Sequence, residues 1–252
     1  MQINLKGQRI LVTGASRGIG KAIASQLSES GAELLLHYNA SKHEAEKLQQ
    51  SLPRYSHLVQ CDLSDLNQVQ GWIPKLVQQY GKIDAVVNNA GIALSVPDDA
   101  PTEAWTAAWL KTMDVNINAM AIICKEFVAH AKTNKNGRIV NISSRAAFRG
   151  DTADYIAYGA SKGAIVSLTR TLARYYGKDG IKAFLIAPGF TRTDMAQDFM
   201  DQYGEEYALN DIALTELTEP KDLAPMITLL CSGLADHATG CTIDINAASY
   251  VH

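Results

Sequence analysis

Two residues with the spacing of one helical face are the first candidates for chemistry in this chain. Tyr158 and Lys162 begin and end the run YGASK, so on a helix their side chains lie on the same side. A free phenol has a pKa of about 10 and is a weak acid at neutral pH, whereas a neighbouring ammonium group favours the phenolate. The pair is therefore suited to giving a proton to an oxygen atom, as the reduction of a carbonyl requires.

A hydroxyl precedes this pair at the end of an apolar run. Ser144 closes the segment GRIVNISS, and a donor there suits an oxygen on which negative charge develops. Taken alone, a Tyr and Lys at this spacing more often mark an amphipathic helix surface. The position of Ser144 just upstream favours the catalytic interpretation.

A glycine-rich segment, TGASRGIG at residues 13–20, follows an apolar run and precedes a helical pattern. Gly14 suits a tight turn, Gly18 allows the backbone to approach a pyrophosphate, and Gly20 allows the helix to pack closely on the strand. The N-terminus of the helix would then face the anion. Glycines at a helix start can also be turn residues only, but the strand and helix around them predict a dinucleotide site.

The end of the second apolar run indicates which dinucleotide fits. An acidic side chain there would bind the ribose 2′-hydroxyl of NAD and repel a 2′-phosphate. This chain has HYNAS at residues 37–41, without an acid, while Arg17, Asn39, Ser41 and Lys42 offer donors. We therefore expect NADP(H), although Arg17 and Lys42 could instead be solvated surface charges.

Polar and small residues also follow the third and fourth apolar runs. Asp62, in CDL, can accept a hydrogen bond from the adenine amino group, and Gly91, in NNAG, can let the backbone pass beside the ribose. Each could equally be a helix cap or a turn residue.

The elements that must position these residues alternate regularly. Apolar runs separated by helical patterns predict an α/β fold, a Rossmann-type doubly wound seven-stranded parallel sheet with helices on both faces. We expect one domain over residues 1–252, with its ligands beyond the carboxyl ends of the strands. A polar, acidic stretch at about 191–219 is too long for a simple connection, and we interpret it as a mobile lid over substrate, called the lid below. The seven runs are RILVTG, ELLLHY, SHLVQC, DAVVNN, GRIVNIS, KAFLIA and CTIDI.

Composition narrows the class of protein. The chain of 252 residues has a net charge of -3, which gives no bulk attraction to nucleic acid or to anionic lipid. It has no apolar stretch of about 18 residues, and its beginning has no apolar leader region, so we expect a cytoplasmic protein without a membrane role. The four Cys and six His residues lack metal-ligand spacing, and we expect no metal.

The ordered motifs TGASRGIG, CDL, NNAG, VN, ISS, YGASK and PGFTRTDM resemble the short-chain dehydrogenase/reductase family over nearly the whole chain. The resemblance implies a homotetramer, with the helices at 105–132 and 158–176 in one contact. It also implies Asn116 as a fourth catalytic residue that kinks its helix and holds a water linking Lys162 to solvent. Pro188, Gly189 and Thr193 would bind the nicotinamide carboxamide.

The motifs and the resemblance together define the expected site. The expected catalytic residues are Ser144, Tyr158, Lys162 and Asn116. The expected cofactor residues are Gly14, Ser16, Arg17, Gly18, Ile19, Gly20, Tyr38, Asn39, Ser41, Asp62, Leu63, Asn89, Ala90, Gly91, Tyr158, Lys162, Pro188, Gly189, Thr191 and Thr193.

Some positions depart from the family pattern. Thr191 stands where an aliphatic residue is usual, IDINAAS replaces a segment that commonly has a glycine pair, and two arginines lie between Ser144 and Tyr158. The arginines, Arg145 and Arg149, could meet an anionic group of the substrate or lie on the surface.

Three motifs indicate a substrate class. ASRGIG, HYNAS and PGFTRTDM most resemble the 3-oxoacyl-acyl-carrier-protein reductase group, which implies a 3-oxoacyl thioester, with acyl carrier protein as a partner in fatty acid or polyketide-like biosynthesis. A basic patch would suit an acidic carrier, whereas the acids of the lid would repel one. The alternatives are a dehydrogenase of a free alcohol, sugar or steroid, and a non-catalytic nucleotide-sensing protein. The candidate patch is Lys132, Lys135, Arg138, Arg174 and Lys178, and the lid acids are Asp194, Asp198, Asp201, Glu205, Glu206 and Asp211.

Overall fold

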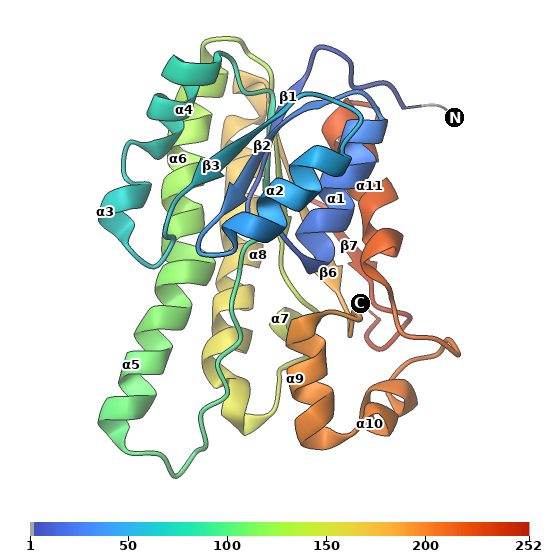
Figure 1. Cartoon of the computed structure of the whole chain (residues 1–252). Helices are drawn as coiled ribbons and strands as arrows, with labels where there is room; N and C mark the ends of the chain where they lie inside the picture. Colours follow the sequence, from blue (N-terminus) through green and yellow to red (C-terminus); the bar gives the residue numbers. More distant parts are fainter. Residues whose placement is uncertain (1–2, 252) are drawn as a thin grey trace.

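All seven apolar runs form strands, and the strands make one parallel sheet in the order β3-β2-β1-β4-β5-β6-β7 (Figure 1). The computed structural model describes residues 3–251, without the side chains of residues 198, 199, 202 and 203. The predicted doubly wound α/β fold is confirmed. The strands are β1 Arg9–Val12, β2 Glu33–Tyr38, β3 Ser56–Gln60, β4 Ala85–Asn88, β5 Gly137–Ile142, β6 Ile181–Pro188 and β7 Thr242–Ile245.

The chain reverses its direction of travel across the sheet between β1 and β4. From β1 it moves outward to β2 and β3, returns to β4 on the other side of β1, and continues to β7. Val12 pairs with Val87, and Asn88 pairs with Asn141, so the carboxyl ends of β1, β4 and β5 lie at the same edge. A doubly wound sheet binds ligands beyond this edge at the reversal point.

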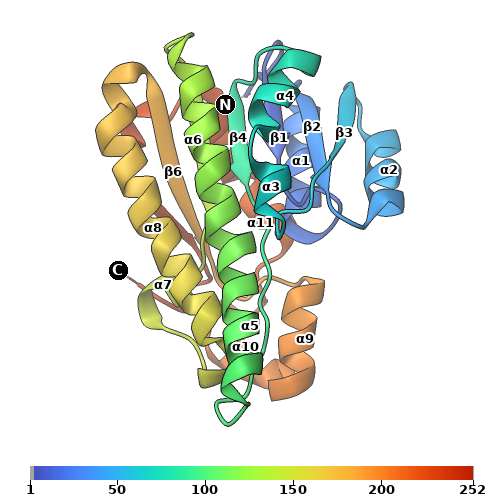
Figure 2. The ribbon, with the colours of Figure 1, turned by 90° about the vertical axis from the view of Figure 1, so that its left-hand side faces the viewer.

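Helices cover both faces because the strands are apolar on both sides (Figure 2). One core cluster joins the sheet to α1 and α11, and the other joins it to α4, α6 and α8. The helices are α1 Gly18–Glu29, α2 Lys42–Ser51, α3 Leu66–Val69, α4 Trp72–Tyr80, α5 Thr102–Met113, η1 Asp114–Asn118, α6 Ala119–Lys132, α7 Ala146–Arg149, η2 Ala153–Tyr155, α8 Ile156–Tyr176, η3 Gly177–Asp179, α9 Asp194–Tyr203, α10 Glu205–Asn210, α11 Pro220–Ser232 and η4 Asp236–Ala238.

The lid is a helical segment with its own small hydrophobic core. It contains α9 and α10, and a parallel bridge between Thr191 and Thr218 closes its base. Ala196, Met200 and Ala208 are buried against one another inside it. Figure 1 shows both helices beyond the carboxyl ends of the strands, where the sequence predicts a cover for the substrate. The predicted mobility of the lid stays a prediction.

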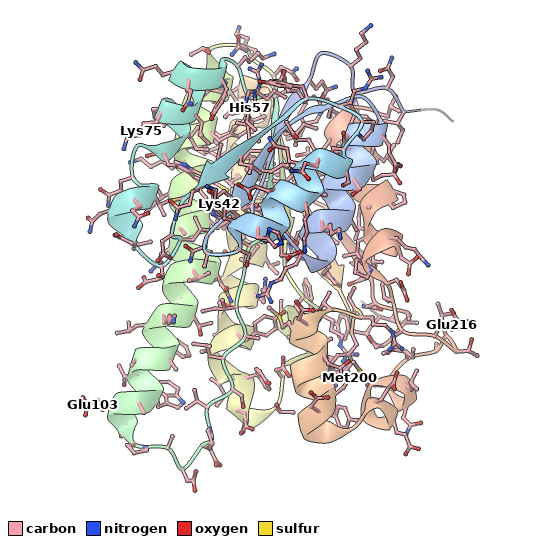
Figure 3. The ribbon with its side chains drawn as sticks, in the orientation of Figure 1. Lys42, His57, Lys75, Glu103, Met200 and Glu216 are labelled. Carbon is pink, nitrogen blue, oxygen red and sulfur yellow. The ribbon has the colours of Figure 1, made fainter. Side chains whose placement is uncertain are left out.

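The predicted basic patch lies at the other end of the sheet. Figure 3 shows His57, near the start of β3, and Met200, in the lid, at opposite ends of the molecule. Arg138 is at the start of β5, is buried, and pairs with Asp236 at 2.8 Å, while Lys132 is bound to an acid in η3. Arg138 and Lys132 thus lie at the amino end of the sheet, outside the cleft at the carboxyl ends, and the docking role of the patch stays a prediction.

In the part of the chain that the structure describes, no helix is both long and apolar enough to span a bilayer. The same residues contain no group of three or more His, Cys, Asp or Glu placed to hold a metal ion.

Candidate active site

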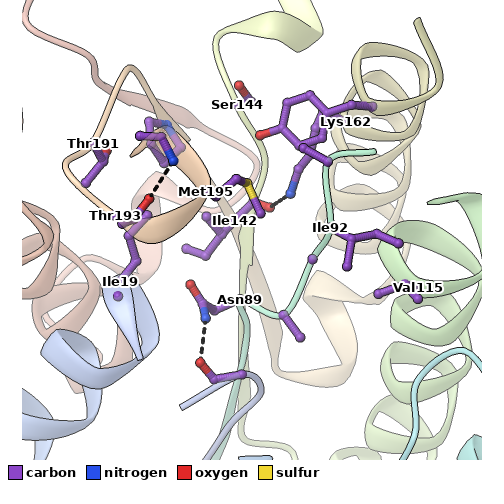
Figure 4. A pocket seen from close by; sticks show the side chains of 18 of the residues that line it. Ile19, Asn89, Ile92, Val115, Ile142, Ser144, Lys162, Thr191, Thr193 and Met195 are labelled. Atoms are coloured by element: carbon purple, nitrogen blue, oxygen red, sulfur yellow. Dashed lines mark hydrogen bonds between the residues drawn. The ribbon is translucent and has the colours of Figure 1, made fainter. Parts of the chain in front are cut away.

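A cleft of about 780 Å³ opens at the carboxyl edge of the sheet, where it runs from the glycine segment to β5 and the lid (Figure 4). Ser144 and Lys162 lie toward one wall, and Thr191 and Thr193 lie on the other. Of the predicted site residues, only Gly20 and Asn116 do not line this cleft among those that the structure describes. The cleft thus brings the nucleotide and catalytic candidates into one site.

The glycines at the start of α1 are required by the local geometry. Gly14 and Gly18 have φ values of 63° and 50°, which L-residues with a Cβ rarely adopt. A Cβ on Gly20 would collide with the carbonyl oxygen of Gly14, so Gly20 packs beneath the loop and does not reach the cleft. The turn predicted at Gly14 and the close packing predicted at Gly20 are present, and the pyrophosphate contact of Gly18 stays a prediction.

A buried histidine, which the sequence analysis did not identify, holds the glycine segment. The backbone N–H of Gly14 donates to Nδ1 of His37 at 3.0 Å, and the other ring nitrogen lies 2.9 Å from the carbonyl oxygen of Cys61. Burial lowers the pKa of His37 to about 4, against the opposing effects of the Cys61 carbonyl and the charge of Asp62. The neutral ring therefore links the loop after β1 to the residue after β3.

Thr13 and Asn89 brace the same loop from the side of β4. The hydroxyl of Thr13 accepts hydrogen bonds from the N–H groups of Asn89 and Ala90 at 2.9 and 3.0 Å. The amide nitrogen of Asn89 donates to the carbonyl oxygens of Thr13 and Gly14. Asn89 lines the cleft as predicted, but its observed contacts position the loop.

The end of β2 presents neutral polar groups, as the sequence predicts. Tyr38, Asn39 and Ser41 line the cleft, and Nδ2 of Asn39 donates to Asp62 at 3.2 Å. Hydrogen bonds from the hydroxyl and backbone N–H of Ser64 hold the pKa of Asp62 below its ordinary value. The region therefore combines one ordered carboxylate with several donors.

Arg17 and Lys42, both offered as phosphate donors, have different surroundings. Arg17 lines the cleft, and its exposed guanidinium lies 3.0 Å from Asp194 of the lid. Lys42 pairs with Glu46 on its own helix at 3.7 Å and is outside the cleft lining. Arg17 is thus placed as a donor to a ligand, and Lys42 is a surface charge.

The turn after β6 forms the opposite wall. Pro188 ends the strand and Gly189 follows it, where a Cβ would lie 2.8 Å from the backbone of Asn246. Thr191 is buried and donates to the carbonyl oxygen of Gly189 at 3.2 Å, while Thr193 caps α9. The hydroxyl at position 191, unusual for the family, thus strengthens this turn.

Ser144, Tyr158 and Lys162 meet at the end of β5. Ser144 follows the strand, and the other two lie in the first turns of α8, with the ammonium of Lys162 5.5 Å from the centre of the Tyr158 ring. Nζ of Lys162 also donates to the carbonyl oxygen of Ile142 at 3.0 Å. The geometry predicted from the YGASK spacing is present.

The electrostatics of the pair differ from the expectation. Burial raises the pKa of Tyr158 to about 12, and the charge of Asp151 adds to this, while a hydrogen bond with Ser144 and the charge of Arg145 oppose it. Burial lowers the pKa of Lys162 to about 8. The charge that lowers the pKa of the phenol is that of Arg145, whereas the ammonium of Lys162 lies over the ring and makes its hydrogen bond with Ile142.

Asn116 lies in a π-helical turn, η1, between α5 and α6, in agreement with the predicted distortion of this helix. Its side chain is fully buried and makes two hydrogen bonds with the backbone of Ile92. Oδ1 accepts from the N–H at 2.8 Å, and Nδ2 donates to the carbonyl oxygen at 2.9 Å. A Cβ on Gly91 would lie 3.2 Å from Oδ1 of Asn116 and 3.4 Å from Nζ of Lys162. Asn116 therefore sits behind the cleft wall and positions the segment beside Lys162.

Known proteins resemble this chain in sequence and in fold. A family model described as Enoyl-(Acyl carrier protein) reductase matches residues 14–247. The 3-oxoacyl-acyl-carrier-protein reductase FabG of Staphylococcus aureus is 32% identical over 246 residues, which cover 96% of this chain and 97% of the relative. A structure of a putative gluconate dehydrogenase from Agrobacterium tumefaciens has a TM-score of 0.91 at 27% identity and covers both chains completely. A Burkholderia cenocepacia short chain dehydrogenase in complex with NADP has a TM-score of 0.88 at 29% identity, with 98% of this chain and 99% of that chain covered.

Proposed function

The chain belongs to the short-chain dehydrogenase/reductase family, whose members are oxidoreductases that act on CH–OH groups. We propose that this chain uses NADP(H) to reduce a ketone to a secondary alcohol. The observation that carries the proposal is the meeting of Ser144, Tyr158 and Lys162 in the cleft that begins at the glycine segment. Such convergence of a proton donor, a cation and an oxyanion donor is what hydride addition to a carbonyl requires.

The cleft has the features that a dinucleotide phosphate needs. Gly14 and Gly18 line the cleft with left-handed backbone that other residues rarely adopt, and the N-terminus of α1 directs backbone N–H groups toward the same place. Arg17, next to donors at the end of β2 and with no acid among residues 37–41, favours a 2′-phosphate. When bound, NADP(H) supplies the hydride or accepts it. Lys162 would hold the nicotinamide ribose, with Pro188, Gly189 and Thr193 at the carboxamide.

The side chains of the chain supply the proton, stabilise the developing charge and position the cleft wall. Tyr158 Oη gives its proton to the carbonyl oxygen as the alcohol forms, and Ser144 donates a hydrogen bond to the same oxygen. Burial raises the pKa of Tyr158 to about 12, so the phenol keeps its proton at neutral pH and can give it to the oxygen on which negative charge develops. Asn116, which holds Ile92, keeps the wall beside Lys162 in place.

Two classes of substrate have support. The name of the Staphylococcus aureus relative supports a 3-oxoacyl thioester on acyl carrier protein, the class that the sequence resemblance implies. The names of solved neighbours, such as the putative gluconate dehydrogenase, support a free hydroxy compound. Pairing of lid acids with arginines removes part of the repulsion expected for an acidic carrier, since Asp194 and Glu205 are both in ion pairs.

We also propose a cytoplasmic homotetramer. Leu110 on α5 and Tyr175 on α8 are large side chains with 56% and 75% exposure, and they lie within the ranges 105–132 and 158–176 expected at one contact. Light scattering of the purified chain should give four times the mass of one chain, whereas a monomer at micromolar concentration would oppose the assignment.

NADPH consumption with a panel of ketones tests the function. The panel holds a 3-oxoacyl thioester on carrier protein, the same acyl group on a small thiol, a keto sugar and a keto steroid, each with NADPH and with NADH. We expect reduction of at least one class, with NADPH preferred. Binding of NADPH without reduction of any ketone, in the wild type and in Tyr158→Phe alike, would support the non-catalytic nucleotide-sensing alternative.

A further inference from the structure

Two arginines and one lid carboxylate meet beside the catalytic residues. Arg145 directly follows Ser144, and its guanidinium is paired with Asp211, at the end of α10. Arg149, on α7, donates to both carboxylate oxygens of Asp211 at 2.9 and 2.7 Å. All three groups lie where the lid faces β5, and both arginines line the cleft.

Arg145 is in an unusual position for a structural charge. Its side chain is 8% exposed, stacks over the ring of Phe190 at 4.4 Å, and has a buried Nη1 that makes no hydrogen bond of good geometry with the described residues, although it is in the ion pair. Its charge also acts on the phenol of Tyr158. A buried guanidinium is costly unless it is paired. Because Arg145 lines the same cleft as Ser144 and Tyr158, an anion bound to it would share that cleft with the reacting carbonyl.

We propose that Arg145 and Arg149 bind a carboxylate of the substrate in place of Asp211, so that the preferred substrate is a free oxo acid or hydroxy acid. Two guanidinium groups beside one carboxylate give it charge-assisted contacts, which are stronger than those between neutral groups. Asp211 already shows that the pair accepts a carboxylate. The proposal rests on the ketone reduction proposed above and names the substrate class within it.

The charges around Arg145 and Arg149 indicate that a substrate carboxylate would replace that of Asp211. Asp151 also acts on Arg145, so the cluster holds two cations and two anions. A third carboxylate would leave the cluster with excess negative charge, whereas replacement of Asp211 keeps the balance. Because Asp211 belongs to the lid, substrate binding would then be coupled to the position of α10.

Matched substrates test this proposal. An oxo acid and its primary amide differ in charge at one group, and we expect the wild type to prefer the acid by at least about tenfold in kcat/KM. Arg149→Gln, at a half-buried position, should remove most of this preference, because kcat/KM for the acid should fall by at least about fivefold more than kcat/KM for the amide. Arg192→Gln is the control, because it removes another arginine–carboxylate pair of the lid, with Glu205 at 2.9 Å, away from the cleft.

Asp211→Asn should strengthen the binding of the oxo acid, whereas Arg149→Gln should weaken it. Loss of the competing carboxylate should lower KM for the oxo acid by about threefold or more and leave the amide unchanged, whereas mere damage to the lid would raise KM for both. Equal use of acid and amide by the wild type, or preference for a phosphorylated ketone or a carrier-bound thioester over the oxo acid, would overturn the inference. Reduction of the neutral amide that depends on Tyr158 would still uphold the proposed function, so the two can fail separately.

Discussion

The backbone N–H of Gly14 donates a hydrogen bond to Nδ1 of His37, 3.0 Å away, across the gap between the loop after β1 and the end of β2. The opposite ring nitrogen is 2.9 Å from the carbonyl oxygen of Cys61, which requires the neutral tautomer with its proton on that nitrogen. Protonation of the ring would place a donor against the Gly14 N–H. The order of the glycine segment thus depends on a neutral His37.

Acid should destabilise the protein through His37. Its pKa is lowered to about 4 in the fold from 6.5, so the unfolded chain takes up the proton first as the pH falls. The stabilisation is complete above pH 6.5 and is lost between 6.5 and about 4, by about 3 kcal/mol at most. Urea unfolding across this range should show a steeper loss for the wild type than for His37→Gln, whose amide keeps a donor and an acceptor but does not titrate.

His43→Gln, on the exposed face of α2, is the control for this experiment and should follow the wild-type profile. Parallel profiles of the wild type and His37→Gln would show that His37 is not the group responsible.

Arg17→Ala should reduce the preference for NADPH. A charge-assisted hydrogen bond to the 2′-phosphate contributes about 1.5–3 kcal/mol, so the ratio of kcat/KM values with NADPH and NADH should fall by about tenfold or more. The exposed pair with Asp194 is a weak competitor for the guanidinium. Lys42→Ala is the control, since Lys42 pairs with Glu46, and should leave the ratio within about twofold. An unchanged ratio in Arg17→Ala would remove Arg17 from cofactor selection.

Replacing either alanine after β7 by glycine should stabilise the protein. Ala247 and Ala248 have φ values of 51° and 58°, at the place where the family commonly has a glycine pair. The left-handed conformation costs an L-residue about 1–2 kcal/mol, part of which the greater freedom of glycine in the unfolded chain offsets. We expect each substitution to raise the free energy of unfolding by about 0.5–1 kcal/mol in urea titrations. Ala100→Gly is the control, because Ala100 lies in a loop and has no positive φ, and it should lower the free energy of unfolding or leave it unchanged. The same response in Ala247→Gly would show that the left-handed conformation of Ala247 is not strained.

The fold was predictable because its signals are local. Each strand is a short apolar run, and the ligand edge follows from the parallel order. Ser144, Tyr158 and Lys162 were predictable for the same reason, since their positions relative to one strand end and one helix start are visible in the sequence.

The contacts that the sequence analysis missed join residues far apart in the chain. His37 meets a backbone group 23 positions away, and Arg149 meets Asp211 at a separation of 62. A lone histidine and a lid acid have no local pattern that points to a partner. The role of Arg145 beside the phenol was equally hidden, because the direction of its side chain depends on Phe190 and Asp211.

Tyr158→Phe tests the central claim most directly. With the ketone that the wild type reduces best and with saturating NADPH, loss of the proton donor should lower kcat/KM by about a hundredfold or more, as general acids contribute. Tyr80→Phe, at the end of α4 against His57, is the control and should keep wild-type activity. NADPH affinity, measured by fluorescence titration, should remain within about threefold in both variants. A loss in kcat/KM below about tenfold in Tyr158→Phe would contradict the assignment of Tyr158 as the acid.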